Sequence, residues 1–323
     1  MVNLLSALVN FPGSASIANT AKQLSEAPQS PSPPPSNITQ FPVGASWQIV
    51  LHQRLAVPPS GDFQPDFVNV WDIDLLENTE GGADNTTILF LKNLPSHPKV
   101  ICYFSAGSYE NWRLDWPTDF DNDNYGSPLK GWDGEYWLDI GSEAVQEVMF
   151  NRIRMAAELG CDAVDPDNVD GYGEAPENKG NRTGKPFTLT QDKTVDFLEK
   201  LAKVAHENSI AIGLKNALEV LPRLQNVVNF AVNEQCVENK ECSSYSSFVS
   251  DLGKPVFHIE YPNGDDQPET IPIRDTEKWC RTYEEDGVGT VNISKLSTVF
   301  KDMELDGWVE YCDGKEFRTS LAP

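Results

Sequence analysis

The stretch Cys161 to Tyr172, CDAVDPDNVDGY, comes directly after a segment with helical spacing. It contains four aspartates within nine residues: Asp162, Asp165, Asp167 and Asp170. Aspartate is depleted in strands, and a cluster of like charges repels itself unless something uses the charge. Strand alternation would point Asp165 and Asp167 to the same face. We therefore predict a strand that ends in an active site. A solvated turn or a cation loop is the alternative, although the spacing of a calcium loop with its terminal Glu is missing.

Eight apolar runs follow at steady intervals from residue 47 and are read as strands: Trp47–Leu51, Phe67–Asp74, Val100–Ala106, Ala163–Val169, Ile210–Asn216, Val228–Glu234, Pro255–Tyr261 and Leu296–Lys301. Helical spacing of apolar residues lies between several of them, most clearly over Glu143–Leu159 and over Thr190–Glu207, where Thr190 is the expected N-cap. Strands that alternate with helices predict a parallel sheet, and eight such units predict a (β/α)8 barrel of the TIM type. A doubly wound α/β sheet is the alternative, but no Gly-rich phosphate loop follows any strand.

The length of 323 residues suits one large domain, since an α/β barrel takes about 250 residues. The start of the chain has a short apolar segment without a positive n-region, and residues 25–36 are the Pro- and Ser-rich run SEAPQSPSPPPS. We therefore expect a weak signal-like segment and a disordered linker over residues 1–40, and a single catalytic domain over 41–323. No run of about 20 apolar residues predicts a membrane span.

The chain is strongly acidic, with a formal charge of −24 and a pI near 4.4. Nucleic acids and anionic membrane surfaces require a basic face, so neither is expected as a partner. The acidity suits an extracellular enzyme or a cationic ligand, although solubility alone explains it equally well. A monomer is expected.

Cysteines and glycosylation sequons favour the secretory pathway. Sequons begin at Asn37, Asn85, Asn181 and Asn292. Of six cysteines, Cys236 and Cys242 flank a short polar loop and are expected to pair, and Cys280 with Cys312 is a plausible second bridge. Cys102 and Cys161 lie beside two predicted strands, where a third bridge and two buried thiols remain alternatives.

Most predicted strands carry charged or amide groups at their C-terminal ends: Asp72 and Asp74, Ser105, Asp167 and Asn168, Lys215 and Asn216, Asn233 and Glu234, Glu260 and Tyr261. Any one of them could be a cap or a salt-bridge partner. Because the active site of a barrel lies at the C-terminal ends of its strands, six strands with this feature predict a site there.

A long loop over residues 108–137 contains seven Tyr and Trp residues. Exposed Trp and Tyr faces stack on sugar rings, and they also attract cations. We expect most of the seven to cover the barrel mouth as a satellite core and one or two to contact a ligand.

No nucleophile elbow, HExxH motif or Walker loop occurs, and no two histidines have metal-ligand spacing. We therefore expect neither a metal nor a cofactor. Carboxylates at the strand ends favour a pair of acids acting on a glycosidic bond. Asp72, Asp74, Asp139, Asp170 and Glu260 would ring the cleft, where they suit the cationic ligand that the net acidity favours.

Seven ordered segments resemble family 114 of the glycoside hydrolases, the endo-α-1,4-polygalactosaminidases: VWDIDL (70–75), VICYFSAGSYENWR (100–113), GEYWLDI (134–140), GCDAVDPDNVDGY (160–172), IGLKNA (212–217), FAVNEQC (230–236) and FHIEY (257–261). The resemblance covers roughly Trp47 to Cys312. It implies a (β/α)8 barrel, secretion and the cleavage of α-1,4-linked galactosamine polymers. The insertion GEAPENKGNRTGK after Tyr172 is longer than the family usually has and could reshape one end of the cleft.

By this resemblance Asp167 and Glu234 match the catalytic pair, and both also close a predicted strand at the same mouth. Asp167 is expected to be the nucleophile, kept ionised by Lys215 and Asn168, and Glu234 the acid/base, with its pKa raised by nearby negative charge. Asp165 and Glu260 are the alternatives for this pair. The expected substrate contacts are Asp72, Asp74, Tyr103, Ser105, Asp139, Asp165, Asn168, Asp170, Lys215, Asn216, Glu260 and Tyr261.

The mechanism is expected to retain the anomeric configuration. Two other functions remain open at this stage: a carbohydrate-binding barrel without catalysis, and a hydrolase of another α-linked glycan.

Overall fold

The computed structural model describes residues 37–58, 63–173, 187–262 and 276–323. The fold below belongs to the unit that spans Pro33–Pro323. The signal-like segment, almost all of the linker and the insertion with its sequon at Asn181 lie outside the described residues.

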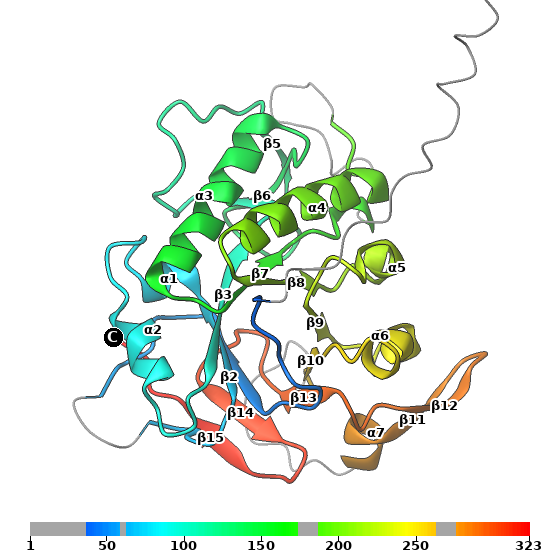
Figure 1. Cartoon of the computed structure of the whole chain (residues 1–323). Coiled ribbons are helices and arrows are strands. Elements are labelled where there is room, and N and C mark those ends of the chain that lie inside the picture. Colours follow the sequence, from blue (N-terminus) through cyan, green and yellow to red (C-terminus); the bar gives the residue numbers. More distant parts are fainter. Residues whose placement is uncertain (1–36, 59–62, 174–186, 263–275) are drawn as a thin grey trace, which may run out of the picture. The chain divides into compact units, whose positions relative to one another are not determined.

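All eight predicted strands are present, and they are parallel neighbours in one sheet (Figure 1). In spatial order they are β1 (Trp47–Val50), β2 (Val70–Asp74), β3 (Lys99–Ser105), β7 (Ala163–Asp167), β8 (Ala211–Lys215), β9 (Phe230–Glu234), β10 (Val256–Glu260) and β13 (Ser297–Phe300). This is the strand order of a singly wound barrel, so the prediction of a parallel α/β sheet is confirmed and the doubly wound sheet is excluded.

The sheet does not end at β13, because two short antiparallel strands extend it to ten: β14 (Trp308–Tyr311) and β15 (Glu316–Arg318). β14 pairs with the edge of β13 that a closed barrel would offer to β1, and the described residues contain no ladder between β1 and β13. Side chains join this seam instead. Trp47 Nε1 donates to Ser297 O at 2.6 Å, and Lys301 Nζ donates to Gln48 Oε1 at 3.2 Å. The sheet is thus curled, with a seam that lacks a backbone ladder.

Seven α-helices accompany the sheet within the described ranges: α1 (Leu75–Asn78), α2 (Thr86–Lys92), α3 (Glu143–Leu159), α4 (Gln191–Glu207), α5 (Leu221–Leu224), α6 (Ser246–Ser250) and α7 (Thr276–Cys280). The two long helices, α3 and α4, lie side by side (Figure 1). α3 ends at Gly160 with φ +98°, and the Thr190 side chain caps α4 as predicted, accepting from Lys193 N at 3.2 Å. Among the described residues, no helix has the length and hydropathy that a membrane span would require.

Apolar residues form two separate cores, which is the pattern expected when the two faces of each strand serve different layers. One core lies between the sheet and the helices. The other fills the inside of the curl and includes Val70, Ile101, Ala163, Ala211, Val232, Ile259 and Val299. Most of the sheet is therefore buried on both faces, and on the inner face of β2 and β7 the polar side chains begin with Asp72 and Asp165, next to the apolar layer that contains Val70 and Ala163.

The aromatic loop forms a small antiparallel sheet of order β4 (Ser108–Glu110), β6 (Glu135–Leu138), β5 (Tyr125–Pro128). Its aromatic rings pack mainly on one another. The ring centroids of the stacked Tyr109 and Tyr125 are 4.4 Å apart, and those of Trp116 and Phe120 are 4.6 Å apart. Most of the loop is thus the expected satellite core. A second hairpin consists of β11 (Thr282–Glu285) and β12 (Gly289–Asn292).

Three disulfides join all six cysteines: Cys102–Cys161, Cys236–Cys242 and Cys280–Cys312. Both expected pairs are confirmed, and the open question about Cys102 and Cys161 is decided in favour of a bridge. This bridge ties β3 to Cys161, which lies in the short turn between α3 and β7.

The disulfides should differ in their effect on stability because they close loops of different length. Cys102 and Cys161 are 59 residues apart, so replacing both by Ala should lower the free energy of unfolding by about 4 kcal/mol on chain-entropy grounds. Cys236 and Cys242 are 6 residues apart, and the same change there should cost about 2 kcal/mol. Urea unfolding of the two double variants would test this order. Equal losses would contradict it.

Candidate active site

A cavity of about 430 Å³ opens at the carboxyl ends of the parallel strands. Residues from β2, β3, β7, β8 and β9 reach it, as does the aromatic loop. Asp167 and Glu234 both line it, each as the last residue of its strand. The two residues predicted as the catalytic pair therefore share one cavity.

Asp167 is held by donors on both carboxylate oxygens. Tyr103 Oη donates to Oδ2 at 3.0 Å, Lys215 Nζ lies 3.1 Å from the same oxygen, and the backbone N–H of Asn168 donates to Oδ1 at 2.7 Å. Charged and polar donors around a carboxylate favour its ionised form and fix its orientation. The predicted donors Lys215 and Asn168 are thus both in contact with Asp167.

Glu234 has a similar set of partners. Lys215 Nζ lies 3.3 Å from Oε2, Asn216 Nδ2 donates to the same oxygen at 3.0 Å, and Tyr261 Oη donates to Oε1. The backbone N–H of Glu234 donates in turn to Asn216 Oδ1 at 2.9 Å. The amide of Asn216 therefore fixes both the backbone and the carboxylate of Glu234.

The prediction that negative charge raises the pKa of Glu234 is wrong. Burial does raise this pKa, but the Lys215 ammonium and the hydrogen bonds from Tyr261 and Asn216 outweigh it and hold the pKa below its ordinary value. The sequence showed the surrounding acids without showing that a buried cation lies between the two catalytic candidates.

Lys215 is 1% exposed and bridges Asp167 and Glu234. Burial alone would lower its pKa, but Asp167, Glu234 and Asp165 together raise it well above the ordinary lysine value. The two carboxylates therefore favour the charged form of Lys215, and its single nitrogen lies between them.

Two further predicted acids lie below this site. Asp72 on β2 and Asp165 on β7 are completely buried, and neither lines the cavity. Burial, followed by repulsion from Asp165, raises the pKa of Asp72 well above its ordinary value. Burial raises the pKa of Asp165 to about 7, against the opposing effect of Lys215. Asp72 and Asp165 act on the site through its electrostatics, without direct access to a ligand in the cavity.

The other predicted contacts divide into two groups. Those that line the cavity are Asp74, Tyr103, Asn168, Asp170, Lys215 and Asn216, while Tyr261 lines the adjoining hollow beyond Glu234. Ser105, Asp139 and Glu260 line neither.

The structure places each of these three side chains away from the cavity for its own reason. Ser105 points inward but is covered, because its hydroxyl accepts from Asn168 Nδ2 at 2.8 Å and contacts Ser108 Oγ. Asp139 lies beyond β6 and accepts from Gly141 N at 3.1 Å. Glu260 has the parity opposite to Tyr261 and is buried on the outer face of β10 beside His258.

Residues of the aromatic loop complete the cavity and were not predicted individually: Glu110, Trp112, Arg113, Trp132 and Glu135. Trp112 and Trp132 are the two of the seven loop aromatics that line it, at 45% and 53% exposure. Burial, together with repulsion from Glu110 and Asp167, raises the pKa of Glu135 to about 7. Sequence reasoning missed Glu110 and Glu135 because they come together only through the pairing of β4 with β6. This pairing cannot be read from one sequence.

Negative charge dominates the cavity. Eight carboxyl groups line it, against one arginine and one lysine: Asp74, Glu77, Glu110, Glu135, Asp167, Asp170, Glu234 and Glu304. Arg113 is already bound to Asp74 and Glu110. Burial and the nearby Asp167 raise the pKa of Asp170 to about 6. A cationic ligand would relieve this excess of negative charge.

In the described part of the chain, one group of three metal-ligating side chains lies close together: Cys236, Cys242 and His258. Its two sulfur atoms are bonded to each other, so neither is a thiolate that could bind a metal ion.

Comparison with known proteins identifies relatives of this architecture. The model of glycoside hydrolase family GH114 matches residues 27–317. The crystal structure of Aspergillus fumigatus Ega3 in complex with galactosamine is 40% identical, with a TM-score of 0.70, and the match covers 85% of this chain and 97% of that one. The glycoside hydrolase domain of PelA from Pseudomonas aeruginosa is 12% identical, with a TM-score of 0.54 over 80% and 95% of the two chains, which is a likeness of fold alone. No curated protein matched the sequence.

A close backbone contact beneath the site should make one glycine irreplaceable. A Cβ added to Gly107 would lie 1.7 Å from the carbonyl oxygen of Asn168, the residue after Asp167. We expect Gly107→Ala to lower the free energy of unfolding by about 3 kcal/mol, since backbone must move to accept the methyl group. Gly173→Ala is the matched control, because nothing lies within 4 Å of its added Cβ. Similar urea midpoints for the two variants would contradict this expectation.

Proposed function

Because this chain belongs to glycoside hydrolase family GH114 and is a glycoside hydrolase, we propose that Asp167 and Glu234 are the carboxylates with which it cleaves α-1,4-linked galactosamine polymers at internal bonds. The observation that carries the proposal is that both carboxylates contact one buried ammonium group in a single acidic cavity. The eight parallel strands would act as a TIM-type barrel, with substrate at their carboxyl ends.

The spacing of the two acids supports a retaining mechanism. Asp167 Oδ2 and Glu234 Oε2 lie 3.1 and 3.3 Å from the same nitrogen, so the distance between them cannot exceed the sum of these two lengths. This limit applies to the two oxygens that face Lys215, and it lies just under the separation of about 6.5 to 9.5 Å that inverting enzymes need between their carboxyl groups to admit a water molecule. Two acids this close suit direct attack by one of them on the sugar.

In this mechanism Asp167 attacks the anomeric carbon while Glu234 gives a proton to the leaving oxygen. A covalent glycosyl-enzyme forms, and the shortened polymer leaves. Glu234 then takes a proton from water, which hydrolyses the intermediate and restores both carboxyl groups. Because the pKa of Glu234 is lowered in the free enzyme, its acid role implies that turnover is fastest on the acidic side of neutrality.

An amine polymer suits the charge of the cavity. Each protonated amine could pair with a carboxylate such as Asp170, whose pKa is raised by burial and by the nearby Asp167. The exposed faces of Trp112 and Trp132 would support sugar rings and attract the same cations. The three disulfides favour an oxidising compartment, so we also propose that the protein is secreted and glycosylated at its exposed sequons.

The reaction and the catalytic pair can be tested together. We expect the native protein to release short amine oligosaccharides from a deacetylated α-1,4-galactosamine polymer and to leave the N-acetylated polymer largely intact. Asp167→Asn and Glu234→Gln should each lower kcat by at least about a thousandfold, because each removes a group needed in the transition state. Product analysis by mass spectrometry is the measurement. Binding without cleavage by the native protein would instead identify a carbohydrate-binding barrel.

The shared lysine gives a separate prediction about pH. Lys215 lowers the pKa of Glu234, so in Lys215→Met the effect of burial remains and that pKa rises. The alkaline limb of kcat/KM, where the acid loses its proton, should therefore move upward by at least about one pH unit. Native protein assayed in parallel corrects for titration of the substrate amines. An unmoved or lowered limb would contradict the role of Glu234 as the acid.

A further inference from the structure

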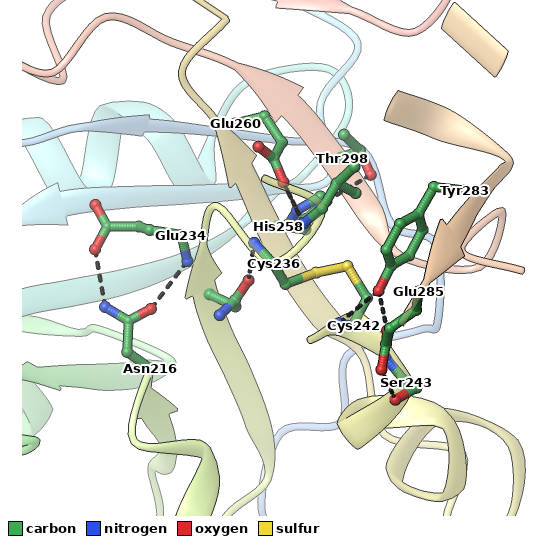
Figure 2. The surroundings of a disulfide bond; sticks show 12 residues. Asn216, Glu234, Cys236, Cys242, Ser243, His258, Glu260, Tyr283, Glu285 and Thr298 are labelled. Carbon is green, nitrogen blue, oxygen red and sulfur yellow. Dashed lines mark hydrogen bonds and ion pairs between the residues drawn. A yellow bond between two sulfur atoms is a disulfide. The ribbon is translucent and has the colours of Figure 1, made fainter. Parts of the chain in front are cut away.

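The turn that follows Glu234 is held by groups that never reach the cavity. β9 ends at Glu234, and Gln235 then takes the left-handed conformation, with φ +62°, while its N–H donates to Ile259 O at 2.8 Å. Cys236 N donates to Asn233 Oδ1 at 3.1 Å, and Cys236 is bonded to Cys242. The chain therefore leaves the catalytic strand through a tight loop closed by a disulfide (Figure 2).

Glu260 fixes the next point of this loop. Its Oε1 accepts from Val237 N at 2.7 Å and lies 2.8 Å from His258 Nε2. Val237 is three residues from Glu234, and both Glu260 and His258 are completely buried. In Figure 2, Glu260 and His258 lie above the disulfide, and the Glu234 carboxylate lies to the left of them.

His258 orients the Glu260 carboxylate in turn. Its Nε2 lies within hydrogen-bond distance of Glu260 Oε1 and holds that oxygen on one side. His258 Nδ1 lies 3.0 Å from Thr298 Oγ1, on the neighbouring strand β13. The imidazole is thus fixed at both nitrogens, and it fixes one oxygen of Glu260 in the direction of the Val237 N–H.

From these contacts we infer that Glu260 is a positioning residue for Glu234, which it acts on through the Val237 N–H and the disulfide-closed loop, with His258 holding it in place. The inference rests on the proposed catalytic role of Glu234. Burying this carboxylate costs free energy, and a leucine would fill the same volume without that cost. What Glu260 provides, and leucine would not, is a hydrogen-bond acceptor for Val237 N in the loop after β9.

The experiment compares Glu260→Leu, Glu260→Gln and a control, Asp162→Leu, on the galactosamine polymer. Asp162 is a buried carboxylate that accepts one backbone N–H, from Val100 at 3.0 Å, but it lies at the opposite end of β7 from Asp167. We expect Glu260→Leu to lower kcat at least tenfold with KM unchanged within about twofold, in the range seen when groups that orient an active residue are removed. Glu260→Gln keeps an acceptor oxygen and should stay within about threefold of the native kcat.

A loss of stability alone would not reproduce this pattern. Asp162→Leu should lower the melting temperature while leaving kcat unchanged at 25 °C. In Glu260→Leu the alkaline limb of kcat/KM should also move upward, because Glu234 loses the contacts with Lys215, Tyr261 and Asn216 that lower its pKa. If Glu260→Leu does not fold, His258→Leu provides the second measurement, with a smaller loss of kcat at constant KM.

Two results would overturn the inference: a native kcat and pH profile in both Glu260→Leu and His258→Leu, or an equal loss of kcat in Asp162→Leu. Failure of the proposed function has a different signature. Glu234→Gln would then keep its activity, whereas an inactive Glu234→Gln together with a fully active Glu260→Leu would exclude only the positioning role.

Discussion

The site depends on one buried ion: the ammonium group of Lys215 lies between Asp167 and Glu234. Burying a lysine is costly unless opposite charges compensate it, and burying two carboxylates next to each other is costly unless a cation separates them. Each of the three groups therefore makes the burial of the other two possible. Removing any one leaves an uncompensated charge, so the geometry of the pair and its protonation are fixed by the same contact.

The parallel sheet explains why these three groups meet. Asp167, Lys215 and Glu234 close β7, β8 and β9, which are consecutive neighbours in the sheet. Residues at the ends of adjacent parallel strands lie close together at the mouth. Asp72 and Asp165 lie below them, where burial keeps the pKa of Asp165 near 7. Lys215 cannot balance all of these acids, so the site is left with an excess of negative charge that suits an amine substrate.

Sequence periodicity predicted the eight strands and the two long helices because buried parallel strands and amphipathic helices leave regular apolar patterns. It also placed Asp165 and Asp167 on one face. Periodicity did not predict the site residues correctly where the face of a strand residue or the pairing of two strands decided which side chains reach the cavity. Glu260 and Tyr261 are adjacent at one strand end, yet they point to opposite faces. Glu110 and Glu135 reach the cavity only because β4 pairs with β6. β14 was not predicted, although it has four residues like β1 and β13, and it pairs with the edge of β13.

At the end of each parallel strand, the inward and outward side chains have different surroundings. Inward residues such as Tyr261 contact the catalytic groups, whereas outward residues face the packed layer between sheet and helices, where a charge has no solvent and no substrate to stabilise it. A carboxylate in that layer is therefore informative when its partners are backbone groups of the active-site loop. Glu260 has such a partner in the Val237 N–H. Its burial is poor evidence for stability, since a buried pair often contributes little. Its burial is better explained by its hydrogen bond to the turn that follows Glu234, which fixes the position of that turn.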